Sequence, residues 1–94
     1  MAMNRLEVLQ SMVEQNPADG FSRYGLAMEF VKSGDLEMGL EQFNALLVHN
    51  PNYAAAYFHG GQTLEKLGRI NEAKSLYAKG IEVTGATGGC AYAE

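Results

Sequence analysis

Residues 17–50 read PADGFSRYGLAMEFVKSGDLEMGLEQFNALLVHN, and residues 51–84 read PNYAAAYFHGGQTLEKLGRINEAKSLYAKGIEVT, so the chain matches itself after a shift of 34 positions. The shift aligns similar residues in five pairs: Pro17 with Pro51, Gly34 with Gly68, Leu36 with Ile70, Phe43 with Tyr77, and Leu47 with Ile81. A fixed period of about 20 to 50 residues is typical of repeat architectures, in which each unit buries its apolar face only by stacking on a neighbour. The sequence therefore predicts a stacked repeat fold, and stacked repeats usually present binding surfaces.

The composition is that of an ordered and mainly helical domain. Hydrophobic residues make up 47% of the chain and charged residues 19%, with only two prolines, and 94 residues fit one domain. The formal net charge is −4 and the seven basic residues are scattered, so we expect no nucleic-acid partner. The single cysteine, Cys90, has no disulfide partner in the chain, and the sequence shows neither a signal peptide nor a membrane-spanning run. These features predict a cytoplasmic protein that does not enter a membrane.

Apolar spacing and helix breakers predict five helices. We expect them over residues 3–15, from the cap Asp19 to Ser33, over 36–49, over 54–67, and from the cap Asn71 to Thr84. The breakers recur at every seventeenth position, namely Pro17, Gly34, Pro51, Gly68 and Gly85. Each 34-residue unit is therefore predicted to be a pair of antiparallel helices joined by short loops.

Two positions in each predicted pair are kept small. Ala27 and Gly61 lie in the middle of the first helix of each pair, and Gly39 and Ala73 lie in the first turns of the second helix. Glycine inside a helix costs about 1 kcal/mol relative to alanine, so it needs a packing reason. We expect these small residues to face each other across each pair, where they let the two helix axes approach closely.

The unit resembles the tetratricopeptide repeat, whose pattern is W-x2-L-G-x2-Y, then A-x3-F, then P over 34 residues. The second unit matches at Tyr57, Gly60, Gly61, Leu64, Ala73 and Tyr77, and the first at Leu26, Ala27, Phe30, Gly39, Phe43 and Pro51, with Arg23 at the tryptophan position. The first helix matches only the second half of a unit. The resemblance implies an all-α fold, an alpha-alpha superhelix of about five antiparallel helices and two and a half repeats. The expected single domain over 1–94 divides into a half repeat 3–17, full repeats 18–51 and 52–85, and a glycine-rich tail or start of a capping helix over 86–94.

The resemblance also implies a concave groove, lined by the first helix of each pair, that binds a peptide or a partner's helix. Carried over by position, the groove residues are Phe21, Tyr24, Met28, Val31 and Lys32 in the first unit and Ala55, Phe58, Gln62, Glu65 and Lys66 in the second. Aromatic residues and methionine suit an apolar ligand because they bury much area and adapt in shape. The alternative interpretation is that Tyr24, Met28 and Phe58 belong to the core, as apolar stripes at helical spacing usually do.

Some family members hold a terminal carboxylate with a set of lysine and asparagine residues that this chain lacks. Tyr24 and Met28 stand at the first unit's lysine and asparagine positions, and His59 stands at the second unit's asparagine position. Binding of that kind is therefore not expected. Lys32 and Lys66, related by the period, are still candidates for contact with an acidic partner, although solvated surface lysines are the commoner case.

No pattern in the sequence indicates catalysis. His49 and His59 have no cysteine, carboxylate or second histidine at metal-ligand spacing, and no phosphate-binding loop is present. Cys90 lacks a nearby basic residue that would lower its pKa, so a thiol enzyme is only a weak hypothesis. We expect a protein that is not an enzyme and has neither a cofactor nor a metal. Besides the binding module, the sequence allows a structural module that dimerises through an uncapped C-terminal helix, with Leu76, Tyr77 and Ile81 as exposed candidates.

Overall fold

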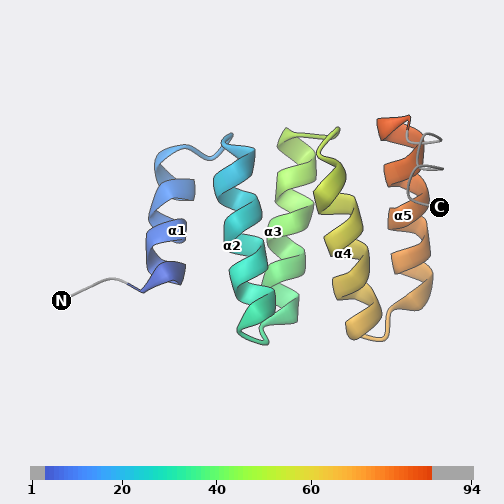
Figure 1. Cartoon of the computed structure of the whole chain (residues 1–94), viewed down its shortest axis with the longest axis horizontal. Helices are drawn as coiled ribbons and strands as arrows, with labels where there is room; N and C mark the ends of the chain where they lie inside the picture. Colours follow the sequence, from blue (N-terminus) through green and yellow to red (C-terminus); the bar gives the residue numbers. More distant parts are fainter. Residues whose placement is uncertain (1–3, 86–94) are drawn as a thin grey trace, which may run out of the picture.

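The computed structural model of the chain describes residues 4–85 and folds them into five α-helices that stand side by side, each antiparallel to the one before it (Figure 1). The helices are α1 (Arg5–Gln15), α2 (Gly20–Lys32), α3 (Leu36–His49), α4 (Ala54–Lys66) and α5 (Ile70–Thr84). The all-α class and the alpha-alpha superhelix predicted from the sequence are confirmed. The predicted tail over 86–94 and Cys90 lie outside the described residues.

The core runs along the whole stack because each helix packs on the helices that precede and follow it in the chain. Three buried clusters join successive helices. They comprise Val13, Leu26 and Phe30; then Ala27, Phe43, Leu46 and Ala56; and then Leu40, Leu64 and Ala73. We call α2 with α3 the first repeat and α4 with α5 the second repeat. The first helices of the two repeats, α2 and α4, are thereby held at fixed positions along one stack.

The two proline-containing loops are closed by the same hydrogen bond from different side chains. Arg23 Nη2 donates to the carbonyl oxygen of Pro17 at 3.2 Å, and Tyr57 Oη donates to the carbonyl oxygen of Pro51 at 2.7 Å. Donors and acceptors are each 34 positions apart. Arg23 also donates to Gln42 Oε1 at 3.1 Å, while its Nε is buried without a partner among the described residues. An arginine therefore replaces the expected aromatic residue because the loop needs a donor at this position.

The small positions allow close packing in both repeats, but not in the same way. A Cβ added to Gly39 would lie 2.6 Å from Val31 Cγ2 and 3.2 Å from the carbonyl oxygen of Ala27, so Gly39 faces α2 as predicted. In the second repeat the nearest neighbour of Gly61 is a residue that the pattern of small positions does not indicate. The nearest atoms to a Cβ on Gly61 belong to the ring of Tyr77, with Cζ at 2.6 Å. Glycine at position 61 leaves room for the ring of Tyr77. The equivalent residues of the first repeat are Ala27 and Phe43, which has a smaller side chain, and these two share a buried cluster.

The helix starts differ between the repeats. Asp19 caps α2 as predicted, because its carboxylate accepts hydrogen bonds from the Phe21 N–H at 3.2 Å and from Ser22 Oγ at 2.7 Å. The prediction that Asn71 caps α5 is wrong: the N-cap residue is Arg69, and Asn71 lies inside the first turn. Arg69 makes no capping bond from its side chain because a guanidinium has no acceptor for the free backbone N–H groups, and it donates to the Glu72 carboxylate.

Candidate partner-binding site

The α2–α4 face carries a small hollow, which we call the notch, with a volume of about 160 Å³. Its lining comes from two helices, with Met28 and Val31 on α2 and His59, Gln62, Thr63 and Lys66 on α4. Of the ten groove residues expected from the sequence, the structure gathers Met28, Val31, Gln62 and Lys66 here. The notch therefore lies where the first helices of the two repeats were expected to form a groove.

The walls of the notch are set by core packing. Met28 and Val31 are partly buried against the cluster that contains Ala27 and Phe43, so only part of each side chain faces solvent. Thr63 is buried, and its Oγ1 donates to the carbonyl oxygen of His59 at 2.8 Å. Gln62 and Lys66 are exposed at the rim.

His59 and Thr63 are lining residues that the sequence reasoning missed. They are four positions apart on α4, and Lys66 follows three positions later, so all three share one helix face. That spacing is the signal that would have placed them beside Gln62 and Lys66 at the groove.

The expected aromatic groove residues divide between packing and exposure. The ring of Tyr24 lies 6.3 Å from Phe43, 5.6 Å from Tyr53 and 5.8 Å from His59, measured between centroids, and so joins the first repeat to the second. Phe58 remains 54% exposed and Phe21 75% exposed. Tyr24 therefore takes part in the packing between repeats, as the alternative interpretation held, whereas Phe21 and Phe58 offer apolar area to solvent.

The remaining expected groove residues stand as follows. Ala55 is half-buried on α4, and Lys32 and Glu65 are exposed in the last turns of α2 and α4. Burial raises the pKa of Tyr77, and the nearby Glu65 carboxylate raises it further through its charge and a hydrogen bond to the phenol. Glu65 is thus turned toward α5 and away from the notch, which it does not line.

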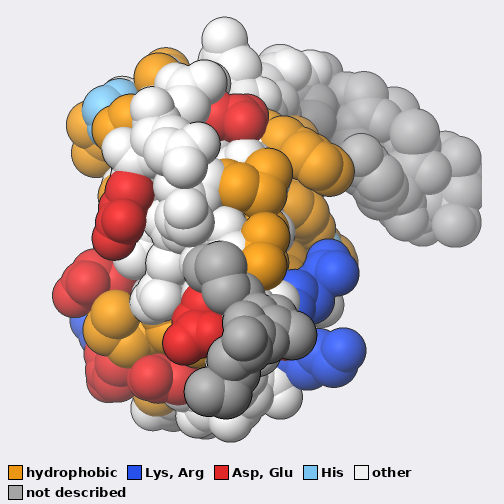
Figure 2. Space-filling view, turned by 90° about the vertical axis from the view of Figure 1, so that its left-hand side faces the viewer, with side chains coloured by type: hydrophobic (Ala, Val, Ile, Leu, Met, Phe, Trp, Pro, Cys, Tyr) orange, Lys and Arg blue, Asp and Glu red, His pale blue; other side chains and the backbone are white. Residues whose placement is uncertain are grey.

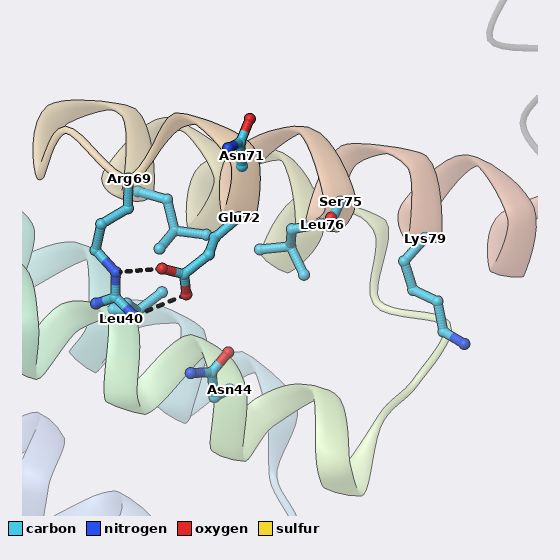
Figure 3. A pocket seen from close by; sticks show the side chains of 9 residues that line it. Leu40, Asn44, Arg69, Asn71, Glu72, Ser75, Leu76 and Lys79 are labelled. Carbon is cyan, nitrogen blue, oxygen red and sulfur yellow. Dashed lines mark hydrogen bonds and ion pairs between the residues drawn. The ribbon is translucent and has the colours of Figure 1, made fainter.

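A second hollow, the outer groove, lies between α3 and α5 and has a volume of about 560 Å³ (Figure 3). Its lining comprises Leu40, Asn44, Leu64, Arg69, Asn71, Glu72, Ser75, Leu76 and Lys79. Leu40 and Leu64 are themselves buried, and the accessible walls are nevertheless more apolar than polar. None of the ten groove residues expected from the sequence lines it.

The charged groups of the outer groove are paired with one another. Arg69 Nε and Nη2 donate to the two carboxylate oxygens of Glu72 at 2.8 and 2.7 Å, as the dashed lines in Figure 3 mark, and Nη1 lies 3.6 Å from Glu37. The hydrogen bond from Arg69 lowers the pKa of Glu72. Lys79 lies 3.9 Å from Glu82. The outer groove therefore keeps little unpaired charge for a ligand.

The described residues contain neither a cluster of metal ligands nor a membrane-spanning helix. No group of three histidine, cysteine or acidic residues that could hold a metal ion occurs within residues 4–85. In the same part of the chain, none of the helices combines the length and the apolar character needed to cross a membrane.

Comparison with known proteins gives one relative in sequence and a consistent fold. No protein-family model matches the chain. The uncharacterized protein MJ0572 of Methanocaldococcus jannaschii is 37% identical over 60 residues, which cover 64% of this chain and 70% of that protein.

Three solved structures share the fold. MamA MSR-1 superimposes with a TM-score of 0.80 at 21% identity, covering 87% of this chain and 47% of that chain. MamA AMB-1 gives 0.78 at 23% identity with 83% and 46% covered, and a further crystal structure of MamA gives 0.81 at 21% identity with 87% and 48% covered. The chain spans about half the length of these MamA structures, and at such identities the similarity establishes the fold alone, an alpha-alpha superhelix of the tetratricopeptide type.

Proposed function

We propose that the chain, which belongs to the same family as the uncharacterized protein MJ0572 of Methanocaldococcus jannaschii, is a non-catalytic module that binds a peptide or a partner's helix on its α2–α4 face. The premise of this proposal is the chain's tetratricopeptide-type protein-interaction fold. The proposed contact residues are the notch, the exposed rings of Phe21 and Phe58, and the neighbouring Lys32, Ala55 and Glu65. Tyr24 supports this face from beneath.

The observation that carries the proposal is the notch itself. Small-molecule sites usually enclose about 300 to 1,000 Å³, and the notch is smaller than that range. A hollow of this size suits one or two side chains of a protein partner. Met28 in its wall adapts its shape easily, and the exposed aromatic rings supply the large apolar area on which interfaces depend.

The test compares two substitutions that fill one hollow each. Gln62→Trp places an indole at the rim of the notch, and Asn44→Trp does the same at the outer groove; both positions are exposed, so both variants should keep the fold. Wild type and the two variants serve as bait in a lysate of the organism that encodes the chain, and the retained proteins are quantified by mass spectrometry. We expect a partner that Gln62→Trp loses and Asn44→Trp retains.

Two results of this capture experiment would contradict the proposal. One is a set of retained proteins that is the same for all three baits. The other is a partner lost only with Asn44→Trp, which would assign the binding to the outer groove. Matched melting temperatures of the three proteins serve as the control for folding.

Self-association through α5 is the second candidate function. Ile70 and Ile81 are 47% and 53% exposed, whereas their equivalents in the first repeat, Leu36 and Leu47, are half-buried. An exposed apolar helix face of this kind can pair with a second copy. Light scattering over a concentration series tests this candidate. Growth in mass that Ile81→Glu abolishes would support it, and a monomer at all concentrations would exclude it.

A further inference from the structure

We propose that the partner of the α2–α4 face is an acidic protein segment that places an apolar side chain in the notch and carboxylates against Lys32 and Lys66. The inference rests on the proposed function, since it assigns the partner of that same face. The charges around the notch carry this inference.

Lys32 and Lys66 are unpaired within residues 4–85. Both are exposed, both lie in the last turn of their helix, and they are 34 positions apart, so they repeat along the face. Three other cations of the described chain have carboxylate partners: Arg5 lies 3.1 Å from Glu29, Arg69 bonds Glu72, and Lys79 lies 3.9 Å from Glu82. Arg23 bonds neutral oxygens, and Lys74 of α5 has no ion pair among the described residues. The two lysines are therefore available to a partner's carboxylates.

The acidic residues on the same two helices are engaged on the flanks of the face. Glu29 of α2 pairs with Arg5 of α1, and the Glu65 carboxylate of α4 lies close enough to the Tyr77 phenol of α5 to raise its pKa. α2 and α4 thus direct carboxylates outward to the neighbouring helices and leave cations beside the notch. Lys66 lines the notch itself, next to Met28 and Val31. A partner with an apolar side chain close to a carboxylate would place the side chain in the notch and the carboxylate against Lys66.

The lysines are not required by the helix ends. A cation near a helix C-terminus is favourable because of the helix dipole. However, the last turns of α1 and α5 contain no basic residue, and the last turn of α3 contains a histidine, His49. Lysine occupies this place only in α2 and α4, the two helices that form the notch. The positions of the two lysines therefore coincide with the α2–α4 face and are not explained by the helix dipole alone.

The charge on the rest of the molecule also favours an acidic partner at this face. The chain carries a net charge of −4, and in the end view of Figure 2 Asp and Glu side chains cover much of the left-hand side with a small Lys or Arg area among them, whereas two larger Lys or Arg groups lie on the right. An acidic segment would be repelled from most of the surface and attracted to the lysines. Charge complementarity of this kind fixes the orientation of a partner and rejects wrong ones.

The test begins with a random twelve-residue peptide library displayed on phage and selected on the immobilised full chain. Synthetic copies of the selected peptides are then titrated by fluorescence anisotropy against the wild type, Lys32→Glu/Lys66→Glu, Gln62→Trp, and the control Lys74→Glu. Lys74 is an exposed lysine on α5 without an ion pair among the described residues. It controls for a general change of net charge.

We expect peptides enriched in Asp and Glu beside Leu, Met or Phe, and Gln62→Trp should abolish their binding. The double lysine variant should weaken the affinity by about five- to tenfold and Lys74→Glu by less than about twofold, because two exposed ion pairs are lost in the first case and none in the second. The difference should shrink at about 0.5 M salt, where exposed charges are screened.

The possible failures are distinguishable. Peptides that Gln62→Trp abolishes but that show no acidic enrichment, or that lose the same affinity in Lys74→Glu as in the double variant, would overturn the acidic preference and leave the proposed function standing. A selection that yields no peptide sensitive to Gln62→Trp would contradict the proposed function and the acidic preference together.

Discussion

The two repeats share their loops and differ in their surfaces. Each closes its proline loop with a side-chain donor, Arg23 in the first repeat and Tyr57 in the second, and each turns between its helices at a glycine with positive φ, Gly34 at 89° and Gly68 at 79°. Each also keeps a small residue where its helices cross. The loop hydrogen bonds and the glycine turns therefore recur with the 34-residue period, although different side chains donate the loop hydrogen bonds.

The surfaces of the repeats diverge where the hollows form. In the first repeat Met38 packs on Phe30, whereas the equivalent residues of the second are Glu72 and Leu64. Glu72 is held by Arg69, and the smaller Leu64 lies at the base of the outer groove. Two differences between the repeats, Met38 against Glu72 and Phe30 against Leu64, therefore accompany the outer groove, while the loops stay the same.

The largest expected effect is at the helix crossing of the second repeat. Gly61→Leu should lower the free energy of unfolding by roughly 1 to 3 kcal/mol, because the new side chain would occupy the space of the Tyr77 ring. Urea denaturation measures the change. The control Ala54→Leu, at an exposed position of the same helix, should change stability by less than about 0.5 kcal/mol. Equal stability of the two variants would show that the crossing has been misplaced.

The capping difference between the repeats comes next. Asp19→Ala should cost about 1 to 2 kcal/mol, because the Phe21 N–H loses its acceptor and Ser22 loses its partner. A comparable loss of stability is not expected from a substitution at the start of α4, because Tyr53 makes no capping bond from its side chain. Chemical denaturation of the variant beside Asp19→Asn, which can still cap, tests the point. An equal loss in both variants would argue against a capping role.

The equivalence of the two proline loops is tested by exchange of their donors. Tyr57→Phe should cost about 1 kcal/mol, since it removes the hydrogen bond to Pro51 and leaves that carbonyl oxygen short of a donor. Arg23→Tyr should keep stability within about 0.5 kcal/mol, because the phenol can take over the bond to Pro17 while the unpaired Nε disappears. Thermal denaturation gives both values. A large loss in Arg23→Tyr would mean that the two positions are not equivalent.

The smallest expected effect is a pH dependence confined to the second repeat. The pKa of Glu72 is lowered in the folded state by the hydrogen bond from Arg69, so the pair stabilises the fold when the pH is above the ordinary carboxyl pKa, and this contribution is lost as the pH falls through the lowered value. Glu72→Gln should therefore remove a small part of the acid sensitivity of stability. Melting curves from pH 7 to pH 3 for wild type and variant should converge at low pH. A constant gap would exclude this pair as the cause.

Sequence reasoning predicted the helices well because the breakers that end them act locally. It failed at Asn71, since an asparagine near a helix start looks like a cap, although the period from Asp35 points to position 69. It did not identify Tyr77 as the nearest neighbour of Gly61, because a small residue in a pattern does not reveal which side chain fills the space it leaves. The pattern placed Met28, Val31, Gln62 and Lys66 on the binding face, but the roles of His59 and Thr63 depend on how α4 lies against α2.

The central claim is that a partner binds the face formed by α2 and α4. Nuclear magnetic resonance of the isotope-labelled full chain, titrated with the purified partner recovered by capture, tests it most directly. The account predicts chemical-shift changes at Met28, Val31, Gln62 and Lys66, with little change at Asn44, Ser75 and Lys79. Changes confined to these last three residues would place the partner in the outer groove and contradict the claim.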